Sequence, residues 1–76
     1  MYYRLKEGEY EKIKLMCSDF NVGEFAEKIG IKRCFMSLIL NRNRTCSKMT
    51  AFCFAKALNS KLEIDDLFDR LDKPIY

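Results

Sequence analysis

Two short stretches with apolar residues at helical spacing, separated by a short turn that begins with a glycine, are the feature that most restricts how this chain folds. Over residues 22–29 the apolar side chains fall on one face of a helix, and Asn21 can cap its first turn. Gly30 follows, and glycine readily takes the left-handed conformation that ends a helix. Residues 32–40 carry a second apolar face. The sequence therefore predicts a helix, a tight turn and a second helix.

The same spacing predicts three more helices around this pair. The first covers residues 9–19, and the fourth is capped by Ser47 and extends to about Leu58. The fifth runs from about Ile64 to Asp72 and ends before Pro74, which cannot continue a helix. Residues 41–46 have no apolar periodicity and many turn formers, so they are predicted to be a loop. We therefore expect an all-α domain with five helices.

A chain of 76 residues is short enough to form one domain around one core. We expect this domain to cover residues 1–76, with its folded core at about 9–72. Residues 1–8 are predicted to be a loosely attached arm that packs a tyrosine on the first helix, and 73–76 a tail. The alternative for the arm is a short strand over Tyr2–Lys6.

Charge is unevenly distributed along the chain. The net charge is only +3, but the segment from Lys28 to Lys61 contains eight basic residues and no acidic one. All eleven acidic residues lie before or after it. This pattern favours a central segment that faces a polyanion. The alternative is a basic surface that contacts only solvent.

Several classes of function are disfavoured by composition. The chain has no histidine, which removes serine–histidine and cysteine–histidine catalysis and the commonest metal ligand. The four cysteines are Cys17, Cys34, Cys46 and Cys53, and no two are spaced as Cys-x-x-Cys. We therefore expect free thiols, no metal, no cofactor and no enzymatic activity. No apolar run reaches the length of a membrane span, and no signal peptide is recognised, so we expect a cytoplasmic protein.

The segment Asn21–Ile39 resembles the helix-turn-helix of the lambda-repressor-like, Cro-type family. Ala26, Gly30, Ile31 and Ile39 match the small residue, the turn glycine, the buried plug and the core residue of that motif. The resemblance extends over about residues 10–70. It implies a compact five-helix domain with the helix-turn-helix at helices 2 and 3, the latter lying in the major groove of DNA. This sequence departs from the family at Val22, Leu38 and Arg42, where a polar residue, a polar or basic residue and a glycine are commoner.

The resemblance also assigns roles to residues. The exposed side of the third helix would read bases through Arg33, Cys34, Ser37 and Leu38. Contacts with DNA phosphates would come from the capping residue of the second helix and from basic or amide residues around the third: Asn21, Lys32, Asn41, Arg42, Asn43, Arg44 and Lys48. Dimer contacts are expected at Leu71, Ile75 and Tyr76, because the last helix is acidic and would be repelled by phosphate.

The function that these features imply is a sequence-specific transcriptional regulator of double-stranded DNA. We expect it to act as a homodimer, as a repressor in a circuit of the phage or mobile-element type. No small-molecule ligand and no membrane are expected as partners. Two alternatives stay open: an antitoxin that binds DNA and a protein toxin, and a helical adaptor that binds proteins only.

Overall fold

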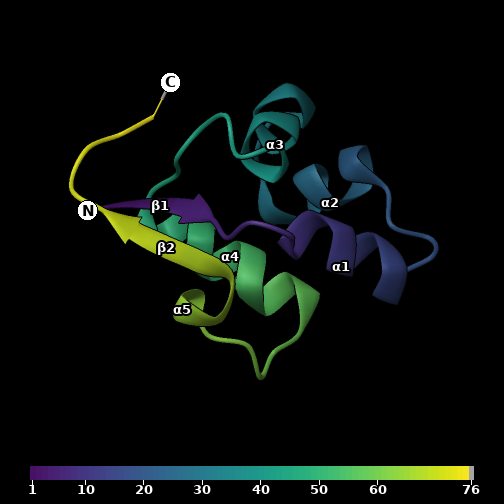
Figure 1. The fold of residues 1–76 in the computed structure, drawn as a ribbon. Coiled ribbons are helices and arrows are strands. Elements are labelled where there is room, and N and C mark those ends of the chain that lie inside the picture. The colour runs from purple at the N-terminus through teal and green to yellow at the C-terminus, as the bar shows by residue number, and fades with distance from the viewer. Residues whose placement is uncertain (76) are drawn as a thin grey trace.

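A computed structural model describes residues 1–75 of the chain (Figure 1). Helices and strands follow one another in the order β1 (Tyr2–Leu5), α1 (Glu9–Met16), α2 (Val22–Ile29), α3 (Arg33–Leu40), α4 (Lys48–Leu58), α5 (Ile64–Leu67) and β2 (Phe68–Leu71). Within this part of the chain, no helix is long and apolar enough to cross a membrane.

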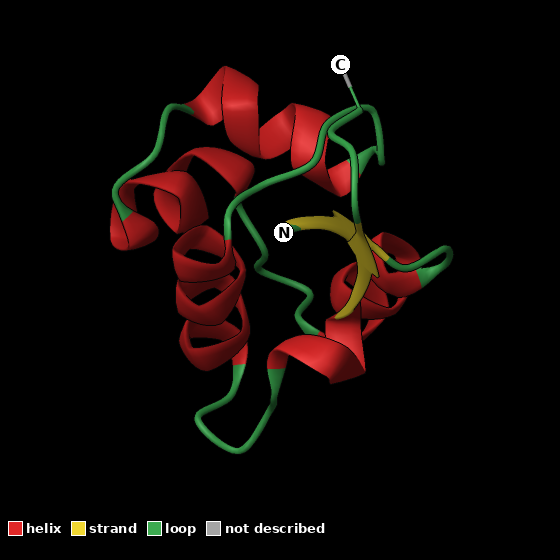
Figure 2. Ribbon diagram, turned by 90° about the vertical axis from the view of Figure 1, so that its left-hand side faces the viewer, coloured by secondary structure: helices red, strands yellow, loops and turns green. Residues whose placement is uncertain are grey.

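The two strands form an antiparallel sheet that joins the two ends of the domain. Tyr2 pairs with Leu71 and Leu5 with Phe68. In Figure 1 the sheet lies in front of α4, and Figure 2 shows the strands flanked by helices. The expected all-α class is therefore wrong: the fold mixes helices with a small sheet.

Two local expectations fail together at this sheet. The N-terminal segment is a strand rather than a loose arm, and its inward side chains, Tyr3 and Leu5, are buried. The fifth helix ends at Leu67 after a single turn, and residues 68–71 continue as β2 instead of extending the helix to Asp72. Each strand becomes stable only against the other, which comes from the opposite end of the chain and lies beyond the reach of local periodicity.

The remaining helices lie close to their predicted positions. α2 begins and ends where the sequence predicts, with the Asn21 side chain accepting a hydrogen bond from the backbone N–H of Glu24. α3 begins one residue later than predicted, at Arg33, and α1 ends at Met16 instead of residue 19. Ser47 caps α4 as expected by accepting a hydrogen bond from the N–H of Thr50.

A row of aromatic rings connects the α2–α3 pair to the sheet through the core. The Phe25 ring of α2 meets Phe54 of α4 at a centroid distance of 5.0 Å, and Phe54 meets Phe68 of β2 at 5.2 Å, both edge to face. Such pairs contribute about 0.5–1.5 kcal/mol beyond the apolar area that they bury. α2, α4 and β2 are therefore held in one body.

The ends of α2 and α3 are closed by the same backbone arrangement. After α2, the N–H groups of Gly30 and Ile31 donate to the carbonyls of Glu27 and Ala26. After α3, the N–H groups of Arg42 and Asn43 donate to those of Ile39 and Leu38. Both are Schellman motifs, which need a left-handed residue just past the helix. Gly30 fills that position at φ 81°, whereas at the end of α3 Arg42 adopts φ 62°.

Candidate nucleic-acid interface

The face of α3 that is turned away from the core is the candidate reading surface. Met36, Ile39 and Leu40 are buried beneath it. Of the four residues predicted to read bases, Arg33 and Cys34 are exposed, and Ser37 and Leu38 are half-buried. Accessibility therefore decreases toward the C-terminal end of α3, and its first turn offers the freest side chains.

Arg33 lies against the first turn of α2. A Cβ atom added to Gly23 would stand 3.6 Å from Cδ of Arg33 and 3.2 Å from Oδ1 of Asn21. Gly23 thus leaves room both for the capping amide and for the stem of Arg33. A glycine inside a helix costs about 0.5–1 kcal/mol relative to alanine, so this space has an energetic cost. Sequence reasoning did not select Gly23, although an isolated glycine in a helical pattern is a signal for a close approach.

The predicted phosphate contacts at the helix starts are on the surface. Lys32 is the exposed N-cap residue of α3, and Lys48 is the exposed first residue of α4. Asn21 is also exposed, but its side-chain oxygen already accepts the capping hydrogen bond. Only its amide group and the neighbouring backbone N–H groups are then available to a phosphate.

Residues of the loop after α3 have more varied surroundings. The Asn41 amide donates to the backbone carbonyl of Ser37 at 2.9 Å, which holds it on the last turn of α3. Asn43 and Arg44 are exposed, and the guanidinium of Arg44 lies 5.8 Å from the ring centroid of Phe35. Arg42 is half-buried and its Nε donates to the carbonyl of Leu5 at 2.9 Å. Arg42 therefore ties the loop to β1, which sequence reasoning did not anticipate.

Arg4 of β1 makes a second side-chain connection between this strand and the loop after α3. Its Nε and one terminal nitrogen both donate to the carbonyl of Arg42, at 3.1 Å and 2.9 Å. β1 also joins the loop through Tyr3, which exchanges two backbone hydrogen bonds with Cys46. The position of Arg4 depends on the sheet, so the sequence offered no signal for it.

The basic segment from Lys28 to Lys61 does not form one surface. Lys56 pairs with Glu63 at 3.6 Å, and the Lys28 ammonium donates to the carbonyl of Ala57 at 3.4 Å. Both contacts involve residues at the C-terminal end of α4. In Figure 1, α3 lies at the top of the molecule and the acidic helix α5 at the bottom. The acidic residues of α5 are thus kept away from the candidate reading face.

The residues predicted to form dimer contacts are only partly available. Leu71 is half-buried in β2 opposite Tyr2. The backbone of Ile75 is bonded to Thr45 of the same chain, where its N–H donates to Oγ1 and its carbonyl accepts from the N–H. These two bonds place the C-terminal segment beside the loop after α3. Tyr76 lies outside the described residues.

The four thiols are free and differ in accessibility. Cys17 and Cys34 are exposed, Cys53 is half-buried and Cys46 is buried. Burial raises the pKa of the Cys46 thiol from 9.0 to about 12. Among residues 1–75, no three cysteine, aspartate or glutamate side chains gather closely enough to hold a metal ion.

Comparisons with known proteins add no relative. The chain matches no protein-family model, and searches of curated proteins and of solved structures find no significant match.

Proposed function

We propose that this protein is a sequence-specific regulator of transcription that binds double-stranded DNA with α3 in the major groove. The observation that carries the proposal is the helix pair α2–α3, joined by the turn at residues 30–32, whose second helix presents an exposed first turn without acidic side chains. B-form DNA has a major groove about 12 Å wide, which admits one helix.

The exposed side chains supply the chemistry that base reading requires. The Arg33 guanidinium can donate two hydrogen bonds to O6 and N7 of a guanine, a contact that distinguishes the base by about 1–3 kcal/mol. Ser37 can meet a base edge, and Leu38 a thymine methyl group. Lys32 at the start of α3, Arg44 in the loop after it and Lys48 at the start of α4 are exposed and carry the positive charge that phosphates attract.

Two thiols on the surface provide a test that needs no mutation. Cys34 lies on the proposed reading face, whereas Cys17 follows α1, and both are exposed. We expect double-stranded DNA, selected from a random pool for binding, to slow alkylation of Cys34 and leave that of Cys17 unchanged. Mass spectrometry of the two peptides measures both rates in one sample. Equal rates with and without bound DNA at both thiols would exclude α3 as the reading helix.

A second candidate function has one observation in its favour. Leu15 and Met16 of α1 are 85% and 83% exposed, and Met16 lines an apolar groove of about 180 Å³ together with Leu58 and Leu62 among others. Exposed apolar residues beside a groove are typical of protein-binding surfaces. An antitoxin would use such a surface for its toxin while α3 binds DNA. Replacing Leu15 and Met16 by lysine should then abolish toxin neutralisation and leave DNA affinity unchanged.

A further inference from the structure

Arg4 and Arg42 bring two positive charges together at the C-terminal end of α3. Arg4 donates two hydrogen bonds to the carbonyl of Arg42, and Arg42 donates one to the carbonyl of Leu5. Both side chains are half-buried. Each guanidinium has five N–H donors, so these three bonds fix the two groups in place and leave most of their donors unused.

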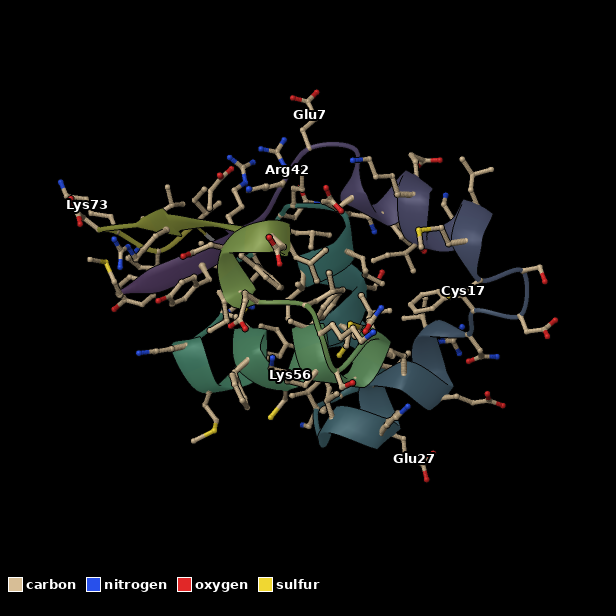
Figure 3. All side chains as sticks on the ribbon, turned by 90° about the horizontal axis from the view of Figure 1, so that it is seen from below. Glu7, Cys17, Glu27, Arg42, Lys56 and Lys73 are labelled. Carbon is tan, nitrogen blue, oxygen red and sulfur yellow. The ribbon has the colours of Figure 1, made fainter. Side chains whose placement is uncertain are left out.

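The surroundings do not balance this charge. Within residues 1–75, neither arginine has a carboxylate within 4 Å. Asp69 pairs with Arg4 in the sheet register, and the exposed Glu7 lies on the same side of the molecule as Arg42 in Figure 3, but neither acid forms an ion pair with them. The end of α3 supplies about half a negative charge. Two guanidinium groups carry two positive charges, so a clear excess remains.

The backbone at Arg42 is a second and independent sign that its side chain has a role. Arg42 is the one non-glycine residue in the described part of the chain with a positive φ. The left-handed conformation is unfavourable for an ordinary residue because its Cβ crowds the backbone, and glycine avoids that crowding. An arginine held in a conformation that favours glycine points to a function for the guanidinium.

We propose that Arg4 and Arg42 together bind one phosphate group, and that this phosphate belongs to the DNA backbone. Planar guanidinium groups suit phosphate oxygens because they donate parallel hydrogen bonds. The source of the phosphate rests on the proposed function, whereas the site itself does not. Arg4, on β1, thereby becomes a DNA contact outside the α2–α3 pair, and the sheet takes part in binding.

Salt dependence of DNA binding distinguishes this role from a purely structural one. Each phosphate contact adds about 0.9 to the slope of log affinity against log salt concentration. We expect Arg4→Gln and Arg42→Gly each to reduce the magnitude of that slope by about 0.9. The double variant should reduce it no further, because the two arginines share one phosphate. Arg42→Gly relieves the backbone strain but also removes the hydrogen bond to the Leu5 carbonyl, so the melting temperature of each variant is measured beside its slope.

Arg70→Gln is the matched control, because Arg70 is an exposed arginine on the neighbouring strand. Its slope should equal that of the wild-type protein. If the slope of Arg4→Gln and Arg42→Gly also stays at the wild-type value, whatever happens to their melting temperatures, the two arginines do not bind a DNA phosphate and that part of the proposal is overturned.

Inorganic phosphate separates failure of this site from failure of the proposed function. In nuclear magnetic resonance spectra of the wild-type protein, phosphate added at constant ionic strength should shift the guanidinium N–H signals of Arg4 and Arg42 and not those of Arg70. If the protein does not bind DNA, these shifts still support a phosphate site, and the DNA function fails alone. No shift at either arginine, together with an unchanged slope or no DNA binding, overturns the site.

Discussion

Arg33 and Arg44 are chemically alike and differ in their surroundings. Arg33 starts α3 and its stem lies against Gly23. Arg44 belongs to the loop after α3 and lies over the ring of Phe35. The first position suits a base contact that depends on orientation, whereas the second suits a phosphate contact that depends mainly on charge.

We expect Arg33→Ala to change sequence preference and Arg44→Ala to change affinity only. Loss of a paired contact to guanine should relax discrimination at one base pair of each half-site by about 1–3 kcal/mol. Arg44→Ala should weaken binding to all sites by a similar factor. Binding measured over a library of sites compares the two variants, which remove the same charge. A uniform loss in both would identify Arg33 as a backbone contact.

The buried thiol of Cys46 should make the free energy of unfolding depend on pH in the alkaline range. Burial raises the pKa of its thiol from 9.0 to about 12. Between these values the unfolded chain loses the proton and the folded chain keeps it, so the free energy of unfolding falls as pH rises, by at most about 1.4 kcal/mol per pH unit. Below pH 9 this contribution is complete. Denaturation at several pH values should show a steeper decline for the wild-type protein than for Cys46→Ala, and parallel declines would contradict it.

At the scale of helices and strands, local signals located the α2–α3 pair but not the sheet. The N-cap at Asn21, the glycine at position 30 and the apolar spacing all act within a few residues, and α2 has its predicted bounds. A helix is predicted over β2 because Ile64, Leu67, Phe68 and Leu71 also fit helical spacing. The strand that forms there instead depends on β1, which the sequence offered only as the alternative to a loose arm, and no local pattern reveals that the two segments pair. The links of Arg4 and Arg42 were missed for the same reason.

The N-terminal strand should therefore contribute strongly to stability. Leu5 is fully buried, and truncating a buried leucine to alanine typically costs about 2–5 kcal/mol. Domains have a total stability of only about 5–15 kcal/mol, with small ones toward the lower end. We expect Leu5→Ala to lose a large part of the free energy of unfolding in urea. Leu15→Ala is the control, since Leu15 is exposed and should change it by less than about 0.5 kcal/mol. Equal effects would mean that β1 is not part of the core.

The size of the whole molecule limits what one copy can recognise. α3 has eight residues and is about 12 Å long, whereas the longest dimension of the molecule is 33 Å, close to one turn of B-form DNA. A helix of that length presents few base contacts, each worth about 1–3 kcal/mol. Specific regulators bind their target sites more tightly than non-specific DNA by about 4–10 kcal/mol. Two copies on neighbouring half-sites reach that range more readily than one.

We therefore expect selection from random double-stranded DNA to yield a palindrome whose half-site centres are about 10 base pairs apart, or a multiple of that spacing. Native mass spectrometry of the complex should give two chains per duplex. A duplex with one half-site scrambled is the control, and it should bind far more weakly, because the second copy loses its base contacts and keeps only phosphate contacts. Inserting about five base pairs between the half-sites should weaken binding as well, since it turns them to opposite sides of the duplex. A single unrepeated motif bound by one chain, with equal affinity for the scrambled duplex, would show that the protein reads DNA as a monomer.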